Sequence, residues 1–196
     1  MDVVWRKQLV SAIARQNPAK ILDLACGSGD VAEMLQNALP RAQVLGLDFS
    51  RPLLTQAKNR GITELAEADA LNLPFADESF DAVTVAFGLR NFSDRMTGLK
   101  EVSRILKKGA VFGLLEFSPP PMPWKIFWNL YLSHLMPLIA QLVARKGDSF
   151  RYLARSIANF PTPSTLNREL ASAGLKLLFS RSYSARLVML NLCIKS

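Results

Sequence analysis

Residues 21–30 of this 196-residue chain combine an apolar strand, a glycine turn and the start of a helix. They read Ile-Leu-Asp-Leu-Ala-Cys-Gly-Ser-Gly-Asp. Glycine has no Cβ, so the backbone at Gly27 and Gly29 can turn sharply and let a ligand lie directly against it. The following helix directs unpaired N–H groups and a partial positive charge toward the same place. The segment therefore predicts an α/β fold that binds a nucleotide-like cofactor at this turn.

Apolar runs of strand length alternate with helical patterns along most of the chain, which indicates a mostly parallel sheet with helices on both faces. We expect seven strands, of which the last two form an antiparallel hairpin at the sheet edge. The expected strands cover residues 20–26, 43–47, 64–68, 80–87, 110–117, 175–182 and 186–194. The expected helices cover residues 3–15, 30–39, 52–60, 94–107 and 165–173.

The composition fits a single domain over residues 1–196, because a chain that is 49% hydrophobic can bury one core. Cys26 and Cys193 lie in strand-like contexts and are expected to be free thiols in a reducing compartment. The chain opens without a signal-peptide pattern, so we expect a cytoplasmic protein. No nucleic-acid signature and no metal-ligand cluster stands out, so neither partner is expected.

The net charge of +8, taken alone, suggests an anionic partner, either nucleic acid or a membrane surface, and the lack of a nucleic-acid signature leaves the membrane surface. The alternative is that basic side chains only solvate helix faces. Lys100, Arg104, Lys107 and Lys108 have helical spacing and fit that alternative.

Residues 119–160 interrupt the alternation of strands and helices. Prolines at 119–121 and 123 predict a stiff connector, and residues 126–144 include no charged side chain. That length could span a bilayer. However, a polar stripe with a spacing of four follows one helical face at Asn129, Ser133, Pro137 and Gln141. We expect an element that lies at a membrane interface or covers a pocket, or else an ordinary buried helix.

Three carboxylates help to choose the cofactor, because the glycine spacing also fits a dinucleotide fingerprint. Asp48, at the end of the second strand, suits the ribose of NAD and of S-adenosylmethionine equally. Asp69, after the third strand, and Asp23, inside the first, favour S-adenosylmethionine. Asp23 as a local backbone cap is the alternative, although a buried carboxylate there needs a partner. A nicotinamide oxidoreductase has no place for Asp69 or for the run Leu73-Pro74-Phe75.

Four further runs point to one protein family. They are Phe87-Gly88-Leu89-Arg90-Asn91, Leu115-Glu116-Phe117-Ser118, Tyr131-x-x-His134-x-x-Pro137 and Asp148-Ser149-Phe150-Arg151-Tyr152-Leu153. Over essentially its whole length, the chain resembles the ubiquinone/menaquinone biosynthesis C-methyltransferases, which implies a Rossmann-like class I methyltransferase fold. Members usually carry a further segment before the Trp5-Arg6-Lys7 found here, so the resemblance implies that this N-terminal segment is lacking.

The resemblance also implies which residues bind S-adenosylmethionine. The glycine turn would cradle its amino-acid part, Asp48 would bind the ribose hydroxyls, and Asp69 with Ala70 would lie at the adenine. Ala86 stands where members often carry a serine. The full expected set is Asp23, Gly27, Ser28, Gly29, Asp48, Asp69, Ala70 and Ala86, with no metal ligand.

The implied reaction is C-methylation of a prenylated quinol ring in respiratory quinone biosynthesis, of the demethylmenaquinol or the polyprenyl-methoxybenzoquinol type. The ring carbon becomes nucleophilic when a neighbouring phenol, with an ordinary pKa of about 10, loses its proton. Arg90 would favour the phenolate, and a water held by Arg90, Asn91 or His134 would remove the proton. The alternatives are that Arg90 is an anchor paired with Asp94 or Glu116, and that His134 is merely packed.

A prenylated substrate resides in the membrane, so we expect peripheral docking at the inner face of the membrane through residues 126–144 and the basic surface. A homodimer is compatible with the sequence. Two other functions stay open: a methyltransferase for another small-molecule acceptor, and a non-catalytic methyltransferase-like module, since a fold does not determine function. Failure to bind S-adenosylmethionine would support the non-catalytic module.

Overall fold

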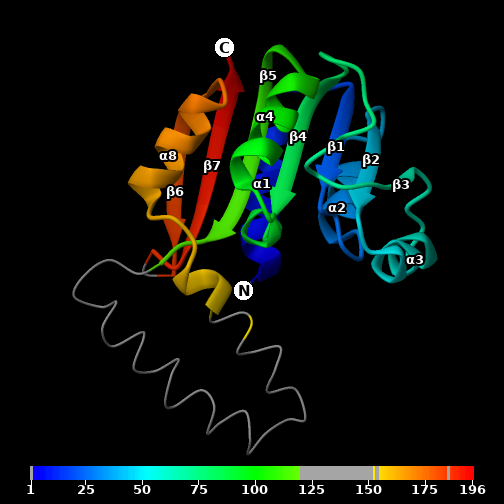
Figure 1. Ribbon diagram of the computed structural model, residues 1–196. Helices are drawn as coiled ribbons and strands as arrows, with labels where there is room; N and C mark the ends of the chain where they lie inside the picture. The colour runs from blue at the N-terminus through cyan, green and yellow to red at the C-terminus, as the bar shows by residue number, and fades with distance from the viewer. Residues whose placement is uncertain (1, 120–151, 153–154, 185) are drawn as a thin grey trace, which may run out of the picture.

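The computed structural model describes residues 2–119, 152, 155–184 and 186–196. One seven-stranded sheet has the strand order β3-β2-β1-β4-β5-β7-β6 (Figure 1). The strands are β1 (Lys20–Leu24), β2 (Gln43–Asp48), β3 (Leu65–Glu67), β4 (Phe80–Ala86), β5 (Leu106–Phe117), β6 (Leu175–Tyr183) and β7 (Val188–Lys195). The helices are α1 (Asp2–Ala14), α2 (Asp30–Ala38), α3 (Arg51–Asn59), α4 (Arg95–Ile105) and α8 (Pro163–Ser172), with a 3-10 turn η1 (Leu89–Asn91).

The sheet is parallel from β3 to β5 and antiparallel beyond it. Strand β1 pairs in parallel with both β2 and β4, so the strand order reverses between β1 and β4. Strand β7 runs antiparallel between β5 and β6. This confirms the expected C-terminal hairpin and places β6 at the sheet edge. The reversal matters because ligands of open α/β sheets bind where the strand order changes direction.

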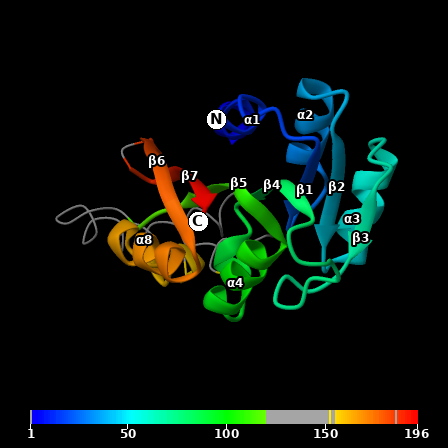
Figure 2. The same cartoon turned by 90° about the horizontal axis from the view of Figure 1, so that it is seen from above.

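Helices cover both faces of the sheet, as expected. Figure 2 shows α1 and α2 on one side and α4 and α8 on the other. Leu9 and Ile13 of α1 join one buried cluster, and Leu99 of α4 with Leu166 of α8 join a second. Helix α1 packs tightly on the sheet at Gly113 of β5. A Cβ added at Gly113 would lie only 2.6 Å from Cδ1 of Leu9, so there is no space for a larger residue. The two clusters hold the central strands, and hence their carboxyl ends, in place.

The expected boundary between the helix over residues 94–107 and the strand over residues 110–117 is wrong. Helix α4 ends at Ile105, because Leu106 already pairs with Phe80 at the start of β4. Lys107 therefore belongs to β5, where its Nζ lies 2.6 Å from Oδ1 of Asp81. Lys107 and Lys108 are thus not part of a solvated helix face.

Residues 120–151 lie outside the described residues, and with them His134 and most of the expected insertion over 119–160. Within the described residues, no helix is long and apolar enough to cross a membrane. Cys26 and Cys193 are free thiols, as expected.

Candidate active site

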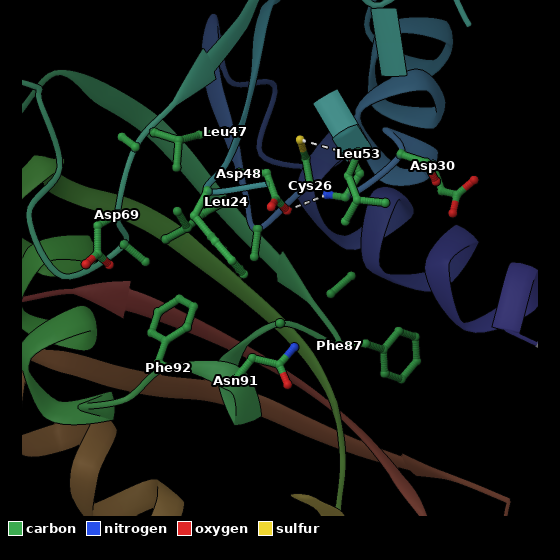
Figure 3. Close-up of a pocket in the computed structure, with 18 of the residues that line it drawn as sticks. Leu24, Cys26, Asp30, Leu47, Asp48, Leu53, Asp69, Phe87, Asn91 and Phe92 are labelled. Atoms are coloured by element: carbon green, nitrogen blue, oxygen red, sulfur yellow. Dashed lines mark hydrogen bonds between the residues drawn. The ribbon is translucent and has the colours of Figure 1, made fainter. Parts of the chain in front are cut away.

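A cavity of about 610 Å³ opens at the carboxyl ends of β1, β2 and β4 and at the loop after β3 (Figure 3). It lies at the reversal of strand order and has the size of a small-molecule site. Seven of the residues expected at the site line it: Gly27, Ser28, Asp48, Asp69, Ala70, Ala86 and Asn91. Gly29 and Arg90 are not among the lining residues, and Asp23 lies in an adjoining recess.

The two glycines of the turn serve different purposes. Gly27 has a φ of +56°, and nothing lies within 4 Å of where its Cβ would be. Gly29 has a φ of +85°, and its Cβ would lie 3.0 Å from Cγ1 of Ile62. Both positions need a conformation that L-residues rarely adopt. Gly27 leaves space for a ligand to approach, whereas Gly29 permits close packing beneath the turn.

Asp48 holds the glycine turn against the end of β2. Its Oδ2 accepts from the backbone N–H of Gly27 at 2.8 Å, and its Oδ1 accepts from that of Ser50 at 2.9 Å. The residue is only 5% exposed. A carboxylate oxygen has more than one acceptor site, so both oxygens can also accept from a ligand hydroxyl.

Asp23 is buried within β1 and only partly hydrogen-bonded. Oγ1 of Thr84 donates to its Oδ1 at 2.7 Å, whereas Oδ2 has no hydrogen-bond partner among the described residues. Burial raises the pKa of this carboxyl group to about 7, and hydrogen bonding by Thr84 and by the backbone of Ala32, together with the charge of Arg6, opposes the rise. Asp23 faces a recess of about 30 Å³ that shares Arg6, Ala25, Cys26, Asp30 and Ala86 with the main cavity. That volume is enough for a water-sized polar group.

Arg6 of α1 also lines the main cavity and the recess. Its Nη1 lies 3.4 Å from Oδ2 of Asp30, and its Cζ lies 5.8 Å from the ring centroid of Phe87. Sequence reasoning did not assign Arg6 to the site, because no pattern in α1 shows which of its side chains reaches the glycine turn. The run Trp5-Arg6-Lys7, noted for its resemblance to the family, is the signal that could have found it.

Arg90 makes an ion pair rather than facing the cavity. Its Nη1 lies 2.6 Å from Oε1 of Glu116 and donates to the backbone oxygen of Phe87, also at 2.6 Å. Glu116 is 1% exposed. Asp94 instead caps α4 by accepting from the N–H of Met96. These contacts favour the anchoring alternative with Glu116 as the partner, and a catalytic role for Arg90 stays a prediction.

The loop after β4 is held in an uncommon conformation close to the end of β1. Phe87 and Ala25 have φ values of +59° and +56°. A Cβ added at Gly88 would lie 2.6 Å from Cβ of Ala25, so only glycine fits between these strand ends. Such conformations persist only where the surrounding structure enforces them, and they cluster at functional sites.

Asn91 ends the turn η1 and lines the cavity. The hydroxyl of Tyr152 donates to its Oδ1 at 2.9 Å. Tyr152 belongs to the Asp148–Leu153 run that resembles the family, but sequence reasoning gave it no role. No group of three or more His, Cys, Asp or Glu side chains that could hold a metal ion occurs within the described residues.

Comparisons of sequence and structure relate this chain to known proteins. Residues 1–195 match the model of the ubiE/COQ5 methyltransferase family. The demethylmenaquinone methyltransferase of Thermus thermophilus is 40% identical over 184 residues, which cover 91% of this chain and 84% of that protein. The enzyme of the same name from Thermotoga maritima is 42% identical over 183 residues, covering 91% and 80%. A solved S-adenosylmethionine-dependent methyltransferase from Thermotoga maritima superposes with a TM-score of 0.71 at 20% identity, covering 99% of this chain and 89% of that one.

Proposed function

Because the chain belongs to the ubiE/COQ5 methyltransferase family, we propose that it methylates a ring carbon of a prenylated quinol of the demethylmenaquinol type. As a family member it is an enzyme, a methyltransferase that uses S-adenosylmethionine, and its fold is Rossmann-like. The quinol is proposed as the substrate because two similar proteins are named demethylmenaquinone methyltransferases.

The recess at Asp23 fits the amino-acid end of S-adenosylmethionine, which carries an ammonium and a carboxylate group. The unpartnered Oδ2 of Asp23 would accept from the ammonium, and the guanidinium of Arg6 would bind the carboxylate. A buried carboxylate without a full set of partners is costly, so a cationic ligand group that completes the set is favoured. The open space at Gly27 and the backbone of Ser28, which both line the cavity, would cradle the same end of the cofactor.

The adenosine end fits the opposite part of the cavity. Asp48 would accept from the ribose hydroxyls with the lone pairs that its two backbone partners leave open. Asp69 and Ala70 line the cavity beyond it and would lie against the adenine. In Figure 3, Asp48 and Asp69 lie apart along the cavity, with Leu24 and Leu47 nearby.

When bound, S-adenosylmethionine supplies a methyl group that is already activated by its sulfonium. The protein then has to align the quinol ring, exclude water and favour loss of the phenolic proton. Phe87 and Phe92 give the cavity apolar walls near Asn91. Arg90, Asn91 and His134 are our candidates for stabilising the phenolate and holding the water that removes its proton.

The observation that carries this proposal is the match to the demethylmenaquinone methyltransferases over 91% of the chain. The test is turnover of reduced, prenylated demethylnaphthoquinone with S-adenosylmethionine, followed by the mass gain of one methyl group for hydrogen. A prenylated methoxybenzoquinol is the second arm and tests for a role in ubiquinone biosynthesis. Unrelated small catechols form the third arm. Turnover of the third class alone would overturn the proposal.

We also propose that the enzyme docks peripherally on the inner face of the membrane, where a prenylated quinol resides. The sequence between residues 126 and 144 is uncharged, and the chain carries a net charge of +8, which suits an anionic surface. Vesicle flotation tests this. Replacing Trp124, Phe127 and Trp128 by polar residues should weaken binding to anionic vesicles, and unchanged binding would contradict the proposal.

A further inference from the structure

We infer that Tyr152 is a positioning residue, whose hydroxyl turns the Asn91 amide so that Nδ2 donates into the cavity to a ring oxygen of the quinol. The inference rests on the proposed function and names one interaction within it. The Asn91 amide would then be a neutral hydrogen-bond donor in the part of the cavity that holds the quinol. Tyr152, which orients this amide, lies outside the cofactor site.

The contact itself is specific. Oη of Tyr152 lies 2.9 Å from Oδ1 of Asn91, although the two residues are 61 positions apart in the sequence. Asn91 is fixed at the end of η1, where its backbone N–H donates to the oxygen of Gly88 at 3.0 Å. Tyr152 is 59% exposed, so its ring contributes little to the core. The hydroxyl therefore has a defined partner at the cavity wall but a small role in stability.

A side-chain amide has a donor end and an acceptor end, and its partners decide which way it faces. A phenol donates readily because its proton is acidic, and it accepts weakly because its oxygen lone pair is delocalised into the ring. Tyr152 thus binds the acceptor Oδ1, and the donor Nδ2 has no hydrogen-bond partner among the described residues. In Figure 3 the nitrogen of Asn91 is turned toward the middle of the cavity and the oxygen away from it.

The cavity needs such a donor at this place. Developing phenolate charge would be repelled by the carboxylates of Asp30, Asp48 and Asp69, which also line the cavity. Arg90 is already engaged by Glu116 and the Phe87 carbonyl, and it is not among the described lining residues. Phe87 and Phe92 line the same cavity as Asn91, so a ring held between their side chains would be shielded from water. A hydrogen bond to the phenolate there favours the charged form and lowers the phenol pKa.

The test compares Tyr152→Phe with Tyr183→Phe as a matched control. The hydroxyl of Tyr183 is on β6 and has no hydrogen-bond partner among the described residues. We expect Tyr152→Phe to lower kcat by about 3- to 10-fold, the range of one lost hydrogen bond, with the Kd for S-adenosylmethionine unchanged. The fall should shrink at alkaline pH, because a less stabilised phenolate forms at higher pH. The charged groups that line the cavity are the same in Tyr152→Phe and in Tyr183→Phe; they are Arg6, Asp30, Asp48 and Asp69. Their titration therefore affects both pH profiles equally and does not contribute to the difference between them.

Asn91 variants separate orientation from packing. Asn91→Asp keeps an acceptor for Tyr152 but has no Nδ2 donor, so we expect a loss of kcat at least as large as that of Asn91→Ala. Tyr152→Phe should add little further loss in the Asn91→Ala background, because both changes remove one interaction. An unshifted pH profile, or losses that simply multiply, would overturn the inference.

A readout without substrate keeps this outcome distinct from failure of the proposed function. In protein labelled with ¹⁵N-asparagine, the Asn91 side-chain amide is identified by its absence in Asn91→Asp. Its resonance should shift in Tyr152→Phe but not in Tyr183→Phe, and an unmoved resonance would overturn the inference. Absence of quinol turnover by the unmodified protein would instead overturn the proposed function.

Discussion

The guanidinium of Arg90 lies 2.6 Å from a carboxylate oxygen of Glu116, and this ion pair is almost fully shielded from solvent. The same carboxylate accepts from the backbone N–H groups of Arg90 and Phe117. Glu116 is on β5 and Arg90 is in η1, so the pair ties the loop after β4 to the neighbouring strand. The position of the loop after β4, which lines the cavity, therefore depends on the ion pair between Arg90 and Glu116.

Removing one partner of this pair should be costly. We expect Arg90→Ala to lower the free energy of unfolding by about 3–5 kcal/mol, because Glu116 is left as an uncompensated buried charge. We also expect turnover to be lost while the Kd for S-adenosylmethionine stays within a few-fold. Chemical denaturation and calorimetric titration measure the two effects.

The paired variant Arg90→Met with Glu116→Gln decides between the two roles of Arg90. It removes both charges and keeps an acceptor for the backbone N–H groups, so most of the stability should return. Return of turnover as well identifies Arg90 as an anchor. A stable but inactive protein would show instead that the guanidinium acts in catalysis.

Asp48→Ala should weaken cofactor binding by about 10- to 100-fold, because hydrogen bonds to a charged acceptor are each worth roughly 1.5–3 kcal/mol. Calorimetric titration with S-adenosylhomocysteine measures this. Removing the ribose hydroxyls from the ligand should cost affinity in the unmodified protein but little in Asp48→Ala. Equal costs in both proteins would show that Asp48 only supports the glycine turn.

Asp23 should make the free protein less stable as the pH rises. Its pKa is about 7 in the folded protein and near 3.8 when unfolded, so between these values only the folded state holds the proton. The contribution of Asp23 to the free energy of unfolding is therefore complete below pH 3.8. It is lost as the pH rises through 7, and the total loss is about 4 kcal/mol at most. Asp23→Asn stays neutral and keeps the acceptor for Thr84.

The free energy of unfolding of Asp23→Asn, relative to the unmodified protein, should therefore increase between pH 4 and about 7 and then level off. Urea denaturation at a series of pH values measures the difference. A difference that stays constant across this range would contradict the assigned burial of Asp23.

Cofactor binding should show the opposite pH dependence. If the ammonium group binds to Asp23, it favours the ionised carboxylate, so affinity for S-adenosylmethionine should rise with pH up to about 7. Binding below that pH should release a proton, which calorimetry in buffers of different ionisation enthalpy detects. Asp23→Asn should bind more weakly and lose this dependence. If the affinity of Asp23→Asn had the same pH dependence as that of the unmodified protein, the ammonium group would not bind at Asp23.

Much of the fold follows from local sequence. Alternating strand and helix patterns predicted the seven strands, and the short turn between the last two predicted their antiparallel pairing. The end of α4 was misplaced because Leu106 is helix-compatible by itself. Its pairing with Phe80, more than twenty positions earlier in the chain, decides that it is a strand residue.

The cofactor end of the site was also visible in the sequence. Parallel strands have their carboxyl ends on the same side of the sheet, so residues at or just after those ends, such as Gly27, Asp48 and Asp69, line one cavity. The role of Arg90 was not visible in this way. Whether its side chain faces the cavity or Glu116 depends on the packing of β5 against the loop after β4.

The sequence by itself thus determined that a cofactor binds at the glycine turn of a mostly parallel sheet, because strand periodicity and glycine turns are local properties of the chain. Tertiary structure decided which side chains complete that cavity. Arg6 reaches the recess from α1, and Tyr152 reaches Asn91 across 61 positions. Contacts of this kind depend on how distant segments pack, and no periodicity within one segment encodes the direction in which its side chains meet another.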